Sequence, residues 1–70
     1  MYRNLERCLK EKGISYRDYA AFLGISEQEA GDRIRGEEEF TLQEIRRTGR
    51  ELFPEHTLSF LFNMSGLSGQ

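Results

Sequence analysis

Residues 15–36 read SYRDYAAFLGISEQEAGDRIRG and contain the starts of two helices. Ser15 is followed three residues later by Asp18, and Ser26 is followed three residues later by Glu29. In such a capping box the serine hydroxyl accepts a hydrogen bond from the backbone N–H of the acidic residue, and the carboxylate accepts one from the N–H of the serine. We therefore predict that one helix begins after Ser15 and that a second begins after Ser26.

Gly24 and Gly36 mark the ends of these two helices, because glycine readily adopts the left-handed conformation found just past a helix C-terminus. The predicted helices span 16–23 and 27–35, so a very short link joins them. Two helices joined by a short link that contains glycine cross steeply, as in a helix-turn-helix. The sequence therefore predicts this motif in the middle of the chain.

The point where these two helices cross requires small side chains. Ala20 and Ala30 occupy the positions where the helices would touch, and Leu23 and Ile25 flank the turn and are expected to point into the core. We predict that the two alanines lie face to face and that the 27–35 helix protrudes from the rest of the chain.

The same signals predict helices on either side of this pair. Thr41 and Glu44 form a third capping box, and Pro54 opposes continuation of the helix that follows it. Nearer the start, Gly13 ends a segment whose apolar residues recur at helical spacing. The further predicted helices span 4–12, 42–53 and 58–62.

The composition is that of one small globular domain. The chain has 70 residues, of which 37% are hydrophobic, and it shows no repeat and no strand-like alternation. We predict an all-α domain over 1–64 and a flexible C-terminal tail over 65–70, which is rich in serine and glycine. Without a secretory pattern, or the roughly 20 apolar residues of a membrane span, the sequence predicts a cytoplasmic protein with no membrane partner.

Six short segments, taken in order, carry a family resemblance. They are KGIS at 12–15, AAFLGIS at 20–26, RIRG at 33–36, FTLQEI at 40–45, LFP at 52–54 and LSFLF at 58–62. In order and spacing, the chain from Leu5 to Phe62 resembles the Cro/repressor-type (XRE-like) helix-turn-helix family, and most closely a phage-associated subgroup in Gram-positive bacteria. The resemblance implies a lambda-repressor-like domain of five short helices that binds DNA.

One departure from the family pattern concerns a buried ion pair. Many members of the family join an arginine and a glutamate at the positions that Leu9 and Ile34 occupy here. Replacing both partners together avoids a stranded buried charge and gives a pair of packed apolar side chains. We predict that Leu9 and Ile34 touch, which tests the alignment with the family.

The resemblance implies that the 27–35 helix enters the major groove of DNA and that its first turns read base edges. The amide of Gln28 suits bidentate pairing with adenine, carboxylates accept from cytosine amino groups, and a bare glycine allows close backbone approach. The alternative for each of these residues is an ordinary solvated position. The candidate base-reading residues are Glu27, Gln28, Gly31 and Asp32.

Phosphate contacts require cationic side chains or hydrogen-bond donors near the two helix starts and near the end of the 27–35 helix. For each arginine the alternative is an ordinary surface ion pair with a neighbour on the helix. Lys10 and Lys12 are possible additions from the first helix. The candidate phosphate-binding residues are Tyr16, Arg17, Ser26, Arg33 and Arg35.

The charge distribution is unfavourable for DNA binding. The net charge is −2, and residues 25–39 hold six acidic and two basic side chains. Glu37, Glu38 and Glu39 follow the presumed reading helix, where carboxylates would repel phosphates even after screening over about 8–10 Å. The run is either a solvated loop that points away from DNA or a sign that the helix no longer reads DNA.

Two classes of function follow. The first is a sequence-specific DNA-binding transcriptional regulator, working as a homodimer on half-sites about 34 Å apart. The second is a protein-interaction module, a phage-type inhibitor, that keeps the helix-turn-helix fold and presents its acidic face to a basic protein partner. An assembly adaptor is a third, weaker interpretation.

The sequence offers no basis for an enzyme. His56 is the single histidine and Cys8 the single cysteine, and Cys8 is expected on the apolar face of its helix. We therefore predict no catalytic residues, no metal site and no cofactor. The apolar side chains near the C-terminal end exceed what one short helix can bury, so we predict a homodimer interface there, formed by Phe53, Leu58, Leu61 and Phe62.

Overall fold

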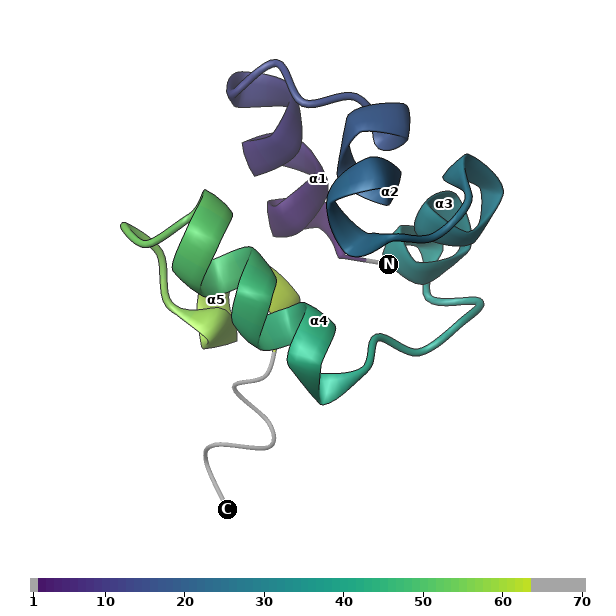
Figure 1. The fold of residues 1–70 in the computed structure, drawn as a ribbon. Coiled ribbons are helices and arrows are strands. Elements are labelled where there is room, and N and C mark those ends of the chain that lie inside the picture. Colours follow the sequence, from purple (N-terminus) through teal and green to yellow (C-terminus); the bar gives the residue numbers. More distant parts are fainter. Residues whose placement is uncertain (1, 64–70) are drawn as a thin grey trace. The chain divides into compact units, whose positions relative to one another are not determined.

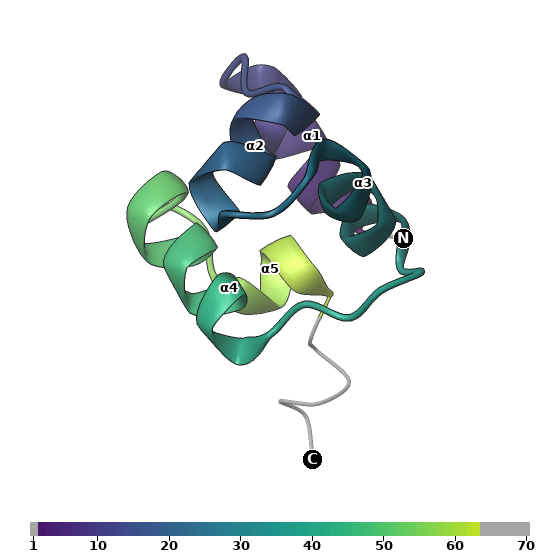
Figure 2. The ribbon, with the colours of Figure 1, turned by 45° about the vertical axis from the view of Figure 1, so that its right-hand side comes forward.

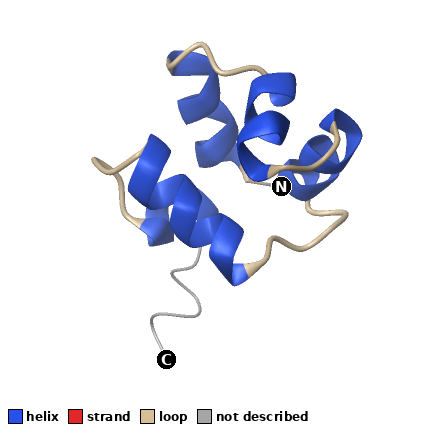
Figure 3. Cartoon of the chain, in the orientation of Figure 1, coloured by secondary structure: helices blue, strands red, loops and turns tan. Residues whose placement is uncertain are grey.

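A computed structural model of the protein describes residues 2–63, and every regular element in that range is helical (Figure 3). The predicted flexible tail, residues 65–70, lies outside the described residues. None of the helices in the described range has the length and apolar character needed to cross a membrane. The elements are α1 (Arg3–Glu11), α2 (Tyr16–Leu23), α3 (Glu27–Arg35), α4 (Leu42–Arg47), the π-helical η1 (Thr48–Leu52) and α5 (Leu58–Phe62).

The chain divides into two compact units, Met1–Glu39 and Phe40–Gln70. The first unit contains α1, α2 and α3, and the second contains α4, η1 and α5. The single domain over 1–64 that the sequence predicts stays a prediction, since the division after Glu39 describes only where the packing of the chain is densest. The break follows the three consecutive glutamates, which are all exposed and therefore contribute little to the packing of either unit.

The three predicted capping boxes are confirmed. Ser15, Ser26 and Thr41 each accept a hydrogen bond from the backbone N–H three residues on, at 3.0, 3.0 and 3.1 Å, and each is met by the reciprocal carboxylate. The helices α2 and α3 have the predicted bounds as a result. Thr57 caps α5 in a similar way through the N–H of Phe60, at 3.1 Å, which the sequence analysis did not single out.

Gly24 closes α2 in the left-handed conformation, with φ +79°. Its N–H donates to the carbonyl oxygen of Ala20 at 2.8 Å, and the N–H of Ile25 donates to the same oxygen at 3.0 Å. The chain then extends through Ser26 and starts α3 in a new direction (Figure 2). The predicted glycine ends at Gly13 and Gly36 are confirmed as well, since both have positive φ.

Within the first unit, α3 makes its most extensive contacts with α2 and also packs against α1 (Figure 1). Ala20 and Ala30 are 3% and 0% exposed, as expected for residues at a helix crossing. Leu9 and Ile34 are also buried, and the backbone N–H of Tyr2 donates to the carbonyl oxygen of Ile34 at 2.9 Å, so the start of the chain is held at the end of α3. Direct contact between Leu9 and Ile34 stays a prediction.

In the second unit the predicted helix over 42–53 changes its winding after Arg47. The segment η1 is a π-helix, in which the N–H of Phe53 donates to the carbonyl oxygen five residues back, that of Thr48, at 3.1 Å. A side chain at Gly49 would collide with Leu58, so the bare glycine lets α5 approach η1 closely. Phe53 then leaves the helical conformation, as a residue before proline tends to do.

The homodimer interface predicted from the sequence needs correction. Phe53, Leu61 and Phe62 are 0%, 0% and 3% exposed, and Leu58 is half-buried beside Gly49. Side chains this buried offer a second copy little accessible surface, contrary to the expectation that α5 leaves them uncovered. The short α5 covers more apolar surface than the sequence predicted, because a residue pattern does not reveal the close approach at Gly49.

We predict that replacing glycine by alanine has opposite effects on stability at two positions of the first unit. Gly24→Ala places a methyl group in a left-handed conformation and should lower the free energy of unfolding by about 1–2 kcal/mol. Gly31→Ala lies inside regular helix, where alanine is favoured by about 0.5–1 kcal/mol, and its methyl would displace only the flexible tip of Arg35. Urea denaturation followed by circular dichroism should therefore show a lower free energy of unfolding for Gly24→Ala and a higher one for Gly31→Ala. Two shifts in the same direction would contradict this account of the turn.

Candidate nucleic-acid interface

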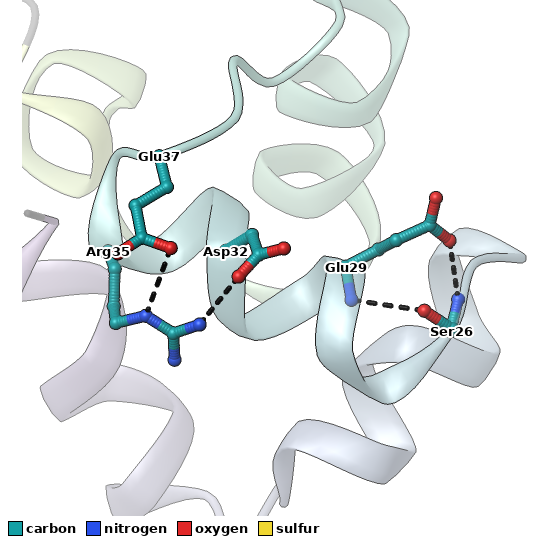
Figure 4. Close-up of polar contacts among 5 residues, drawn as sticks. All are labelled: Ser26, Glu29, Asp32, Arg35 and Glu37. Atoms are coloured by element: carbon teal, nitrogen blue, oxygen red, sulfur yellow. Dashed lines mark hydrogen bonds and ion pairs between the residues drawn. The ribbon is translucent and has the colours of Figure 1, made fainter.

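The turn at Gly24 leaves the first turn of α3 accessible. Glu27 and Gln28 are exposed, and Ser26 and Glu29 of the capping box lie beside them (Figure 4). Glu27 and Gln28 are exposed although Ala30, further along the same helix, is buried. Two of the four predicted base-reading residues are therefore on a surface that a ligand can reach.

The position of Gly31 needs correction, because the sequence analysis placed it among the outward residues. Gly31 is buried. A Cβ atom built there would lie 3.5 Å from the ring of Tyr16 and 2.9 Å from Nη1 of Arg35. These two side chains close off the backbone that a nucleic acid would have to approach. Helical spacing alone had suggested an open position, since it does not reveal what a neighbouring helix lays over a glycine.

Tyr16 links all three helices of the first unit. Its ring lies over Gly31 of α3, and its hydroxyl donates a hydrogen bond of 2.8 Å to Oε2 of Glu6 on α1. Burial raises the pKa of the Tyr16 phenol, and the hydrogen bond and charge of Glu6 raise it further. The phenol proton that a phosphate would accept is thus already engaged, which weakens the sequence-based assignment of Tyr16 to phosphate binding.

Asp32 and Arg35 neutralise each other on α3. Nη2 of Arg35 lies 2.6 Å from Oδ1 of Asp32, and its Nε lies 3.7 Å from Oε1 of Glu37 (Figure 4). The Asp32 side chain is only 22% exposed. Asp32, a predicted base-reading residue, and Arg35, a predicted phosphate-binding residue, therefore form an ion pair with each other. A nucleic acid would have to displace one carboxylate from Arg35 before using its charge.

The remaining charged side chains at the α2–α3 surface differ in how strongly ion pairs and hydrogen bonds hold them. The Arg17 side chain is 85% exposed and lies 4.0 Å from the 61% exposed Glu27, an ion pair of little strength. Glu29 is held by the backbone N–H of Ser26, and this hydrogen bond, with a smaller contribution from Arg33, lowers the pKa of its carboxyl. Arg17 is consequently the most accessible of the predicted phosphate-binding cations, whereas Arg33 is half-buried.

A basic face on α1 was only partly anticipated. Arg3, Arg7 and Lys10 line a shallow hollow of about 350 Å³ together with Glu6, the acceptor of the Tyr16 hydroxyl. The sequence analysis named Lys10 but neither arginine. The signal was present, because positions 3, 7 and 10 recur at helical spacing opposite the buried Leu5.

The chemistry available at this surface is hydrogen bonding and ionic contact. Within residues 2–63, no group of three or more histidine, cysteine, aspartate or glutamate side chains is placed to hold a metal ion. Cys8 is buried on α1. The exposed side chains at this surface carry amide, carboxylate, guanidinium and ammonium groups, which form hydrogen bonds and ion pairs with a ligand.

The bond between Tyr16 and Glu6 predicts a specific dependence of stability on pH. A phenol whose pKa is raised by folding stabilises the native state at pH below its unfolded pKa of about 10, and this stabilisation is lost as the pH rises through the folded value. Tyr16→Phe should lower the free energy of unfolding by about 1 kcal/mol at neutral pH. The difference between the two proteins should shrink above pH 10. Glu6→Gln, which keeps an acceptor without the charge, is the matched control, and a difference that does not vary with pH would contradict the assignment.

Comparisons were made with models of protein families, with curated proteins and with solved structures. None of them matches this chain.

Proposed function

We propose that this protein is a sequence-specific DNA-binding regulator of phage or mobile-element type, with α3 as the helix that enters the major groove. The observation that carries the proposal is the α2–α3 arrangement, in which two capped helices turn at a left-handed Gly24 and expose Glu27 and Gln28 at the start of the second. A helix presented by such a turn fits the width of the major groove and reads bases with its N-terminal residues.

Gln28 is the residue best suited to read a base. It occupies the second position of α3, one residue before the Glu29 of the capping box, so its amide is not needed for the cap. A glutamine amide pairs bidentately with the N6 and N7 atoms of adenine. Exposure, position and chemistry thus converge on Gln28, and Glu27 beside it offers an acceptor for a cytosine amino group.

The cations that would hold the DNA backbone are Arg17 at the start of α2 and the α1 face formed by Arg3, Arg7 and Lys10. Each phosphate neutralised by such a side chain adds about 0.9 to the slope of log affinity against log salt concentration. Because few cationic side chains are available to contact phosphates, a single copy should bind DNA weakly. Two copies on adjacent half-sites would provide the affinity that one lacks.

The decisive experiment is selection of binding sequences from random duplex DNA with the purified protein, followed by affinity measurements on the selected sequence. Gln28→Ala should weaken binding by about 1–3 kcal/mol and relax the preference at one base pair. The sequence contains a matched control, since Gln43 is also exposed and also occupies the second position of a helix with a capping box. Gln43→Ala should leave that base preference unchanged.

Two outcomes would overturn the proposal. One is that no sequence is enriched by selection at low salt. The other is that Gln28→Ala and Gln43→Ala have the same effect on the preferred sequence, because the loss would then not come from α3.

A second function, recognition of a basic protein partner, is favoured by the acidity of the same surface. The Glu27 and Glu37 side chains are 61% and 65% exposed, and Glu38 and Glu39 are exposed as well. Arg35, which would offset them, is already engaged with Asp32. A helix-turn-helix with this surface is suited to bind a positively charged protein in place of DNA.

Glu27→Gln distinguishes the two functions by the sign of its effect. Under DNA binding it removes a repulsive carboxylate and releases Arg17, so general affinity for duplex DNA should rise by about 0.2–1 kcal/mol. Under recognition of a basic protein it should weaken binding by a similar amount. Fluorescence anisotropy with labelled duplex DNA and with a basic polypeptide measures both effects, and Glu55→Gln, an exposed glutamate of the second unit, is the control.

A further inference from the structure

The second unit carries a basic face that the proposed function does not use. Leu42, Gln43, Arg46, Arg47 and Arg50, from α4 and η1, line a hollow of about 420 Å³. The three arginines are all the basic residues of the sequence after Phe40. Leu42, at one end of this group, is 59% exposed and is the most exposed large apolar side chain recorded for the described residues. Together these five residues form the arginine face.

The arginine face is only partly neutralised within its own unit. Arg47 and Arg50 share the carboxylate of Glu51, at 3.4 and 3.7 Å from the same oxygen. Arg46 is exposed, and no ion pair of Arg46 is recorded within residues 2–63. Arg46 and Arg50 therefore keep guanidinium groups that a ligand can reach, since Arg46 is exposed and the Arg50 side chain is 70% exposed. Such a face is suited to bind carboxylates, because the planar guanidinium fork pairs with them in a bidentate manner.

The complementary group is present in the same sequence. Glu37, Glu38 and Glu39 form an exposed run, and the only ion pair recorded for them within residues 2–63 is that of Glu37 with Arg35, at 3.7 Å. These exposed carboxylates are opposite in sign to the exposed guanidinium groups of Arg46 and Arg50.

We propose that the arginine face is a self-association surface that binds the Glu37–Glu39 run of a second copy of this chain. Because each copy carries both groups, two copies related by a two-fold axis can make the contact twice, as an isologous dimer requires. In the sequence, Leu42 lies between the acidic run and the arginines. Leu42 belongs to the arginine face and is 59% exposed, so a second copy bound there would also cover this apolar side chain.

The inference extends the proposed function, which needs two copies for each operator, but it does not require that the protein bind DNA. It replaces the interface through Phe53, Leu61 and Phe62, which are buried. Contacts between exposed charges are individually weak and are screened by salt. The dimer is accordingly expected at high protein concentration and low ionic strength, and it should dissociate as salt is added.

The test uses two charge-reversed variants of the full chain, without DNA. Arg46→Glu/Arg50→Glu makes both groups acidic, and Glu38→Arg/Glu39→Arg makes both basic. Each variant alone should dimerise at least about tenfold more weakly than the natural sequence, because like charges now face each other. An equimolar mixture of the two should associate again, because both contacts are then attractive. Sedimentation velocity at low and high salt measures all of these states.

The matched control is Lys10→Glu/Lys12→Glu, which changes the net charge as much as Arg46→Glu/Arg50→Glu but alters an exposed residue of α1 and the exposed residue at its C-terminal cap. It should leave the dimer intact, and circular dichroism checks that every variant is folded. The proposal is overturned if the natural chain stays monomeric at low salt, if the reversed variants dimerise as it does, or if their mixture does not associate. It is also overturned if Arg46→Glu/Arg50→Glu weakens DNA binding in a chain that never dimerises, because the face would then bind phosphate.

Discussion

The carbonyl oxygen of Ala20 accepts hydrogen bonds from the N–H groups of both Gly24 and Ile25, and this pair of bonds fixes the direction in which α3 leaves α2. The left-handed conformation of Gly24 makes the geometry possible, and the Ser26 cap starts the next helix two residues later. Everything proposed for the surface of α3 depends on this turn. Were the chain to leave α2 in another direction, Ala30 would no longer be placed against α2 and the first turn of α3 would lie elsewhere.

The sequence predicted well those features that depend on residues close together in the chain. The capping boxes at Ser15, Ser26 and Thr41 involve partners three residues apart, so their residue types are sufficient to place the helix starts. Features that depend on distant residues were missed. The hydrogen bond between Tyr16 and Glu6 joins two helices, and the burial of Gly31 results from a ring on another helix. The approach of Leu58 to Gly49 is likewise a contact between residues distant in the chain, which no local pattern contains.

At the candidate site, the number of charged residues says less about binding than which of them are already held in ion pairs. The sequence correctly indicated that residues 25–39 are acidic, but it treated Arg35 and Arg17 as equivalent. In the structure Arg35 is held by Asp32 at 2.6 Å, whereas Arg17 is 85% exposed with one distant partner. Ion pairing is decided by side-chain reach across a helix turn and into the following loop, and several pairings were compatible with the same sequence. The surface available for recognition is therefore smaller, and more dependent on Gln28, than the sequence suggested.

The two proposals concern the same electrostatic problem, the negative charge beside the helix proposed to read DNA. Exposed carboxylates at Glu37–Glu39 would repel DNA phosphates, and the arginine face of the second unit leaves positive charge uncompensated. If each acidic run is covered by the arginines of a second copy, dimer formation removes the repulsion at the same time as it supplies the second reading helix. Affinity for DNA and affinity between copies are then linked by a shared free energy, and each must strengthen the other by the same factor. In that case the acidic run limits DNA binding by single copies, and its repulsion is removed only in the assembled pair.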